Sequence, residues 1–203
     1  MLKAIARKVL PVGVRLALRY AINRTGELKT NWHLAQVRRK AWTKRPGSLV
    51  RCLDYTVRIN DGPNFYILYK DIFIHRIYHF EAQRPDPLIL DCGSNIGMSI
   101  LYFKLVYPQA RIIGFEPDPA IFPYLQENVT RNSLKDVQLV QAALAPKEGS
   151  LAFYSDGKYG SCLAEHLPTD IPEGYQKYEV PCVRLKDYLT KPVDFLKMNI
   201  EGA

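Results

Sequence analysis

The sequence contains few cysteines, and their spacing argues against the roles that paired cysteines usually play. The four cysteines form no C-x-x-C pair and have no matching histidine pair: Cys52, Cys92, Cys162 and Cys182. Neither a structural zinc site nor a disulfide framework is expected. His75 and His79 have the spacing of helical metal ligands, but their neighbours are apolar and no third ligand is evident, so no metal is expected. Unpaired thiols are typical of a reduced compartment, which predicts a cytoplasmic protein.

Long apolar runs are also missing, and acids are nearly absent from the first fifty residues. Residues 1–50 carry twelve Lys or Arg residues and one acid, a net charge of +11, whereas the whole chain has +8. The segment is too charged to span a bilayer and has no clean signal-peptide core. We expect residues 1–45 to form a basic helical segment. It either contacts an anionic membrane surface, which would make the protein membrane-associated, or is a solvated helix that packs one face on the domain.

From residue 87 onward, strand-like and helix-like segments alternate, which predicts an α/β fold with a mostly parallel sheet. The predicted strands are 87–91, 111–115, 137–141 and 194–199. The predicted helices are 97–106 and 119–132. Residues 150–154 and 178–183 are expected to pair as an antiparallel excursion from this core.

The preceding piece, residues 46–83, has a different pattern. Residues 50–59 alternate between apolar and polar side chains, and Asn60–Pro63 is a turn signal before the apolar run Phe65–Tyr69. This order predicts a β-hairpin that leads into a short helix over residues 71–80. The chain is therefore divided into a basic N-terminal segment (1–45), a hairpin and short helix (46–83) and an α/β domain (84–203).

The most informative segment is Asp91–Gly97, with the sequence DCGSNIG. It lies between a predicted strand and a predicted helix, where glycine lets the backbone approach a ligand closely. Such a turn is expected to offer free N–H groups at the helix N-terminus. The next apolar run, Ile112–Phe115, ends in Glu116, whose carboxylate can accept hydrogen bonds from both hydroxyls of a ribose. The layout predicts a nucleoside site.

The glycine spacing separates two candidate ligands. A dinucleotide fingerprint requires G-x-G-x-x-G, but only Gly93 and Gly97 are present, four residues apart. The D-x-G-x-N-x-G form resembles motif I of methyltransferases that use S-adenosylmethionine (SAM), a cofactor without a phosphate. The alternative is an ordinary strand-to-helix turn in which Asp91 and Asn95 only cap backbone groups.

Several segments together resemble the FkbM family of SAM-dependent O-methyltransferases, over roughly residues 68–203. Besides the motif, the similar segments are Phe115–Pro119, Leu125–Asn132, Val180–Tyr188 and Asp194–Ala203. The resemblance implies SAM as cofactor and methyl transfer to a hydroxyl, often on a sugar or natural-product scaffold. The family usually has Asp where this chain has Asn199. A SAM-binding remnant or interaction module without turnover is the main alternative, and a nicotinamide-dependent enzyme is the other.

The candidate cofactor residues follow from the motif and its resemblance. They are Asp91, Gly93, Ser94, Asn95, Gly97, Glu116, Pro117, Asp118, Ala142 and Ala143. We expect Gly93, Asn95 and Gly97 to receive the amino-acid end of SAM. Glu116 is expected to hold the ribose, with Ala142 and Ala143 against the adenine. Asp118 either assists at the ribose or caps the next helix.

The acceptor side is less well marked. Glu201 and Asn199 end the fourth strand and are the candidate catalytic or acceptor-orienting residues; alternatively, they hydrogen-bond a tight turn at Gly202. Tyr78 or Phe80 is expected either to cover the cofactor or to pack in the core. A small-molecule or glycan acceptor is expected. Nucleic acid is not, because no N-P-P-Y or D-P-P-Y segment follows the fourth strand.

The resemblance also implies a Rossmann-like sheet with seven strands in the order 3-2-1-4-5-7-6. Only the first four of these can be identified in the sequence. We therefore expect a sheet truncated after strand four, with that strand as an unpaired edge. Such a chain is expected to bind SAM better than it transfers methyl groups.

Overall fold

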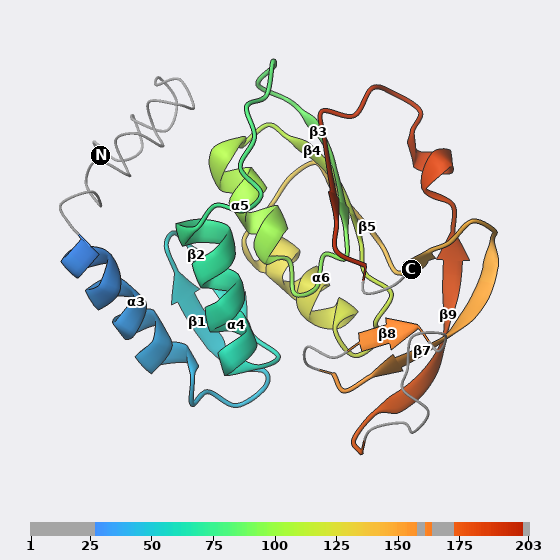
Figure 1. Ribbon diagram of the computed structural model, residues 1–203. Coiled ribbons are helices and arrows are strands. Elements are labelled where there is room, and N and C mark those ends of the chain that lie inside the picture. Colours follow the sequence, from blue (N-terminus) through green and yellow to red (C-terminus); the bar gives the residue numbers. More distant parts are fainter. Residues whose placement is uncertain (1–26, 158–160, 164–172, 201–203) are drawn as a thin grey trace.

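The computed structural model describes residues 27–157, 161–163 and 173–200. Its centre is a four-stranded sheet in the order β10-β3-β4-β5 (Figure 1). In sheet order the strands are β10 (Phe195–Met198), β3 (Leu88–Cys92), β4 (Arg111–Phe115) and β5 (Val137–Val140). Each neighbouring pair is parallel. The α/β prediction is confirmed, and every predicted strand ends within one residue of an observed one.

Two helices connect these strands on one face of the sheet (Figure 1): α5 (Met98–Val106) and α6 (Phe122–Arg131). Both predicted helices are confirmed, although α6 begins three residues later than expected. Asp118 accepts a hydrogen bond from the N–H of Ala120 (2.8 Å), so a separate turn precedes the helix. Helix α5 is buried on nearly every side, because the N-terminal part of the chain covers the face that the sheet does not.

A second four-stranded sheet lies on the other side (Figure 1). In sheet order its strands are β6 (Ala143–Leu144), β9 (Gln176–Val183), β7 (Gly149–Ser155) and β8 (Ser161–Leu163). The pairing of β7 with β9 is antiparallel, as predicted. The 3₁₀-helix η3 (Leu185–Tyr188) then leads back to β10, and its Tyr188 ring packs edge-on against Phe115 at 4.8 Å between ring centroids.

The N-terminal part contains a helix, a hairpin and a second helix: α3 (Glu27–Ala41), β1 (Leu49–Cys52), β2 (Tyr55–Arg58) and α4 (Gly62–Tyr69). The predicted hairpin was wrong in its second strand. Both strands lie within residues 49–58 and close at Leu53, whose φ is +55°. The apolar run at 65–69 is helical because Asp61 caps it, accepting from the N–H of Asn64 at 2.7 Å, and a proline stands in the first turn.

The predicted helix over 71–80 was also wrong in its limits. Helix α4 continues directly into one π-helical turn, η1 (Lys70–Ile74), and the chain turns away at Arg76, whose φ is +58°. His75 and His79 therefore do not share a helix face. Within the described residues, no three His, Cys, Asp or Glu side chains are grouped to hold a metal ion. Phe80 stacks on Phe195 at 4.5 Å between ring centroids, so it belongs to the core.

Strand β10, the last in sequence of the four parallel strands, is an edge of the parallel sheet in the described part of the chain. Its Leu196 and Met198 side chains are 43% and 54% exposed. The order β10-β3-β4-β5 agrees with the predicted order for the first four strands. Of the basic segment, residues 1–26 lie outside the described residues. Among the helices that are described, none combines the length and the apolar character needed to cross a membrane.

Candidate functional site

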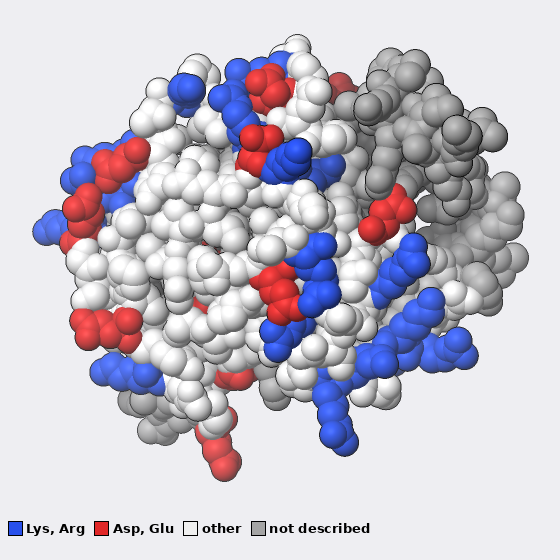
Figure 2. All heavy atoms as spheres, turned by 180° about the vertical axis from the view of Figure 1, so that it is seen from behind, with Lys and Arg blue, Asp and Glu red and all other residues white. Residues whose placement is uncertain are grey.

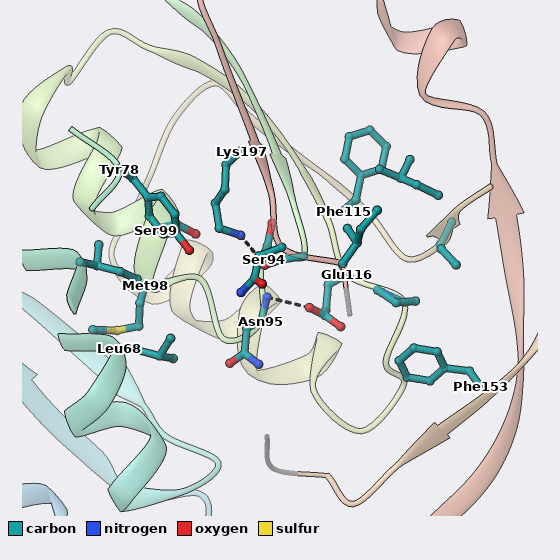
Figure 3. Close-up of a pocket in the computed structure, with 18 residues that line it drawn as sticks. Leu68, Tyr78, Ser94, Asn95, Met98, Ser99, Phe115, Glu116, Phe153 and Lys197 are labelled. Atoms are coloured by element: carbon teal, nitrogen blue, oxygen red, sulfur yellow. Dashed lines mark hydrogen bonds between the residues drawn. The ribbon is translucent and has the colours of Figure 1, made fainter. Parts of the chain in front are cut away.

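A cavity of about 950 Å³, counting its open mouth, lies at the carboxyl ends of the parallel strands (Figure 3). Because these ends meet at one edge of the sheet, the loop after β3 comes next to Glu116 after β4 and Asn199 after β10. The hydroxyl and amide groups of Ser94 and Asn95 belong to that loop. Three residues of the predicted cofactor motif, Gly93, Ser94 and Asn95, therefore line this cavity.

The loop after β3 needs both of its glycines. Gly93 has φ +80°, and a Cβ there would lie 1.9 Å from the carbonyl oxygen of Asn199. Gly97 has φ +88°, and a Cβ there would lie 2.9 Å from the side chain of Leu125. Glycine at the first position thus lets β10 pass against the loop, and at the second it lets α6 pack on the start of α5.

The loop itself does not supply free N–H groups, although the expectation concerned the N-terminus of the helix, which begins at Met98. Each N–H from Gly93 to Gly97 donates within the protein, at 2.6 to 2.9 Å. The acceptors are the carbonyls of Phe115 and Ser94, the Glu116 carboxylate and the Asn95 amide oxygen. These hydrogen bonds hold the loop in one conformation, and they leave its N–H groups unavailable to a ligand.

Glu116 is the acid of the cavity. Its carboxylate accepts from the N–H of Asn95 at 2.6 Å, drawn dashed in Figure 3, and from the N–H of Asp118 at 3.0 Å. Burial raises the pKa of Glu116 to about 7, and these two N–H donors offset only part of that rise. Each carboxylate oxygen accepts one backbone bond, so each keeps capacity for a hydroxyl donor.

Asp91 does not line the cavity. Its side chain is fully buried beneath the loop, where one oxygen accepts from the Ser99 hydroxyl at 2.6 Å and the other pairs with the Lys197 ammonium at 2.8 Å. Ser94 lies at the cavity wall, and its hydroxyl donates to the Asp91 carbonyl at 2.9 Å. The predicted acid of the motif therefore supports the loop from behind.

The other predicted cofactor residues divide into two groups. Pro117, Ala142 and Ala143 line the cavity, as Glu116 does. Asp118 and Gly97 do not line the cavity. Asp118 is fully buried, where it accepts from the hydroxyl of Ser155 as well as from the N–H of Ala120, so it acts as a capping residue of the turn.

Of the two predicted catalytic residues, Asn199 lines the cavity and its backbone N–H donates to the Cys92 carbonyl at 3.0 Å. Glu201 lies outside the described residues.

Tyr78 lines the cavity from the segment after η1. Among the lining residues that the prediction missed are Phe153, which β7 places at the cavity wall, and Lys197 of β10. A lysine within an otherwise apolar strand is a signal that could have identified the second, since lysine is rarely buried unless paired.

Comparison with known proteins points to one family. The model of the methyltransferase FkbM domain matches residues 91–203. "Methyltransferase 1" of Beauveria bassiana is 32% identical over 172 residues, which cover 74% of this chain and 69% of that protein. The "31-O-demethyl-FK506 methyltransferase FkbM" of Streptomyces tacrolimicus is 27% identical over 168 residues, covering 67% of this chain and 64% of that protein.

A third relative, the "2-O-methyltransferase NoeI" of Sinorhizobium fredii, is 27% identical over 146 residues, which cover 64% of this chain and 59% of that protein. The chain thus spans about two thirds of the length of these relatives. All three matches and the family model include the loop after β3 or the strands that flank it.

Proposed function

The chain belongs to the methyltransferase FkbM domain family, and on that basis we propose that it binds SAM and transfers its methyl group to a hydroxyl oxygen. The acceptor we propose is a small molecule or glycan. Two relatives support oxygen as the target atom, because their names specify O-methylation.

The observation that carries this proposal is the Glu116–Asn95 unit. A carboxylate with spare acceptor capacity stands at the end of β4, and the loop N–H of Asn95 fixes its orientation at 2.6 Å. Phe115, Ala142 and Phe153 supply apolar surface to the cavity, and Figure 3 shows Phe115 and Phe153 on the side of Glu116. A carboxylate for two ribose hydroxyls beside an apolar slot for a base is the set of contacts that an adenosine group needs, so the residues present fit SAM.

SAM would supply the electrophile, a methyl group on a positively charged sulfur. The tasks left to this chain are to hold the adenosine, to exclude water and to align the acceptor oxygen. Tyr78 and Asn199 also line the cavity, and Figure 3 shows Tyr78 on the side opposite Glu116, so we propose these two residues for that alignment. Glu201 remains our candidate for the base that takes the proton of the acceptor hydroxyl.

A SAM-binding module without turnover is the second candidate function. It is favoured by Asn199, an amide that cannot act as a base at the position where the family usually has an acid. The proposal is tested by incubating the chain with methyl-labelled SAM and a panel of hydroxyl-bearing sugars and polyketides. Label in an acceptor and formation of S-adenosylhomocysteine support transfer; SAM binding without label in any acceptor supports the binding module.

We predict that cofactor affinity falls when the pH is lowered through about 7. The pKa of Glu116 is about 7, and its ionised form is the better acceptor for two hydroxyls. Below that pH, ligand binding must displace a proton, so affinity for S-adenosylhomocysteine should fall by up to about tenfold per pH unit. Calorimetric titrations between pH 8 and pH 5.5 measure this, and a flat profile would contradict it. Glu116→Gln is the matched variant that should have no such dependence.

The raised pKa of Glu116 also makes the stability of the free protein depend on pH, but with the opposite sign to cofactor affinity. Between its unfolded value of 4.5 and its folded value of about 7, Glu116 holds a proton that the unfolded chain has lost. Its contribution to stability therefore grows as the pH falls from 7 towards 4.5, while cofactor affinity decreases. Thermal melts of the free protein measure this contribution. Relative to the Glu116→Gln variant, the melting temperature of the parent chain should rise as the pH falls from 7 towards 4.5.

We also propose that residues 1–45 contact anionic membrane surfaces. In the described part of this segment, Arg38, Arg39 and Lys40 are exposed in the last turn of α3. Figure 2 shows Lys and Arg side chains gathered at the lower right of the rear face, the side on which α3 lies. Each basic residue near such a surface contributes about 1 kcal/mol. Co-sedimentation should therefore show binding to phosphatidylserine vesicles that weakens with salt, and little binding to neutral vesicles.

The matched variants each replace three exposed lysines or arginines with alanine. Replacing Arg38, Arg39 and Lys40 should weaken sedimentation with anionic vesicles, whereas replacing Lys135, Lys147 and Lys177, which are exposed elsewhere, should not. Equal sedimentation with both lipid types, or equal loss in both variants, would contradict a membrane-binding segment.

A further inference from the structure

Lys197 is a buried lysine for which the proposed function has so far given no reason. Strand β10 alternates: Leu196 and Met198 are exposed, whereas the Lys197 side chain points inward and is 5% exposed. Figure 3 shows it directed towards the loop that carries Ser94, at the side of Tyr78. A buried ammonium is costly unless it is paired, so its partners indicate what it is for.

Its ammonium contacts the end of β3 and the start of the loop that follows it. The ammonium pairs with Asp91 at 2.8 Å and donates to the carbonyls of Gly93 at 2.6 Å and Cys92 at 3.2 Å. The ring of Tyr78 lies beside it, 5.4 Å from the nitrogen to the ring centroid. Lys197 thus fixes the peptide after Gly93, the part of the loop that borders the cavity.

The protonation state of Lys197 follows from these contacts. Burial is the largest single influence and lowers the pKa of the ammonium, but Asp91, Tyr78 and Glu116 together outweigh it, and the pKa of Lys197 lies above its usual value. Lys197 is therefore a cation at neutral pH. It cannot serve as the base for an acceptor hydroxyl, and its role in the site must be that of a fixed positive charge.

The positive charge of Lys197 lies at the wall of the cavity. Among the described lining residues, Lys197 is the one cation and Glu116 the one carboxylate, and they mark different parts of the wall. The loop N–H groups from Gly93 to Gly97 are all used within the protein, so they are not free to receive an anion. The amino-acid end of SAM carries an α-carboxylate, and the proposed adenosine contacts with Glu116 direct that end towards Gly93 and Lys197.

We propose that Lys197 forms the subsite for the amino-acid end of the cofactor, which rests on the proposed use of SAM. Its charge attracts the α-carboxylate, and its bond to the Gly93 carbonyl holds the loop in the position that receives this end. The Cys92 contact, the longest of the three, is the one that a carboxylate oxygen can replace. The adenosine half is held by other residues and does not depend on Lys197.

The test compares two ligands that share the adenosine and the thioether. S-adenosylhomocysteine has the amino-acid group, and 5′-methylthioadenosine does not. Lys197→Met removes the charge and keeps a long unbranched side chain. Calorimetry should show affinity for S-adenosylhomocysteine reduced by about tenfold or more, the size of one charge-assisted interaction. Affinity for 5′-methylthioadenosine should stay within about twofold.

The double variant Asp91→Asn with Lys197→Met is the decisive control, because it leaves no unpaired carboxylate behind. It should show the same selective loss of S-adenosylhomocysteine affinity. If the double variant binds S-adenosylhomocysteine as the parent chain does, or if both ligands weaken together, Lys197 only balances Asp91 and supports the fold, and the subsite is refuted. If the parent chain binds neither ligand, the proposed function itself fails, which is a different result.

Discussion

Replacing Glu116 with alanine should weaken binding of SAM and of S-adenosylhomocysteine by about tenfold to a hundredfold. The carboxylate lies in the cavity, and each of its oxygens accepts only one backbone hydrogen bond, from Asn95 and from Asp118. Two ribose hydroxyls can donate to the capacity that remains. Charge-assisted hydrogen bonds of this kind contribute about 1.5–3 kcal/mol, which corresponds to this range of affinities. Isothermal titration calorimetry measures the change directly.

The variant also removes two hydrogen bonds that hold the loop, so folding must be checked alongside binding. Glu116→Gln retains the volume and one strong acceptor, and it should lose less affinity than Glu116→Ala. Glu148→Ala, at an exposed position between β6 and β7 that does not line the cavity, is the matched acid-to-alanine control and should bind as the parent chain does. Equal affinity in a folded Glu116→Ala variant would show that the acid does not hold the ribose.

Gly93→Ala should lower the free energy of unfolding by about 3–5 kcal/mol, the cost of disrupting a buried ion pair and its surroundings. The added Cβ would lie 1.9 Å from the Asn199 carbonyl, so β10 would have to move away from the loop. That movement separates Lys197 from Asp91 and breaks the bond from the Asn199 N–H to the Cys92 carbonyl. The melting temperature should fall by about 10 °C, and SAM binding should be lost with it.

Gly174→Ala is the matched control for backbone strain. Gly174 has a similar positive φ of +92°, but a Cβ there would meet nothing within 4 Å. It should show only the cost of a left-handed alanine, about 1–2 kcal/mol. Similar melting temperatures for the two variants would mean that the contact between the loop and β10 is not tight in solution.

The sequence predicts the parallel sheet and the cofactor loop well, because their signals are local. The apolar run before Asp91 is a fully buried strand, and the run before Glu116 is a largely buried one. The motif has glycine at position 93 because a Cβ there would collide with the Asn199 carbonyl. The limits of the helices near residues 61–80 were less predictable. There the start of α4 depends on a single cap at Asp61, and the helical run ends before one left-handed residue, Arg76. The aromatic residues between them have a pattern that is equally typical of a strand.

The parts of the site that were missed come from long-range contacts. Lys197 meets Asp91 only because β10 pairs beside β3, more than a hundred residues along the chain. Phe153 reaches the cavity through the pairing of β7 with β9. The N–H groups of Gly93, Ser94 and Asn95 are occupied for a similar reason, since their acceptors at Phe115 and Glu116 come from the end of the neighbouring strand.

The most direct test of the central claim, that the cavity behind Gly93 is a SAM site, is to incubate the chain with labelled SAM and, separately, with labelled NAD and to measure how much of each is retained. The two ligands share an adenosine, but NAD needs a pyrophosphate cradle that the occupied N–H groups of this loop do not provide. We predict saturable retention of SAM that unlabelled S-adenosylhomocysteine competes away and that Glu116→Ala weakens, with no retention of NAD. Retention of NAD, or no retention of SAM by a folded chain, would contradict the account.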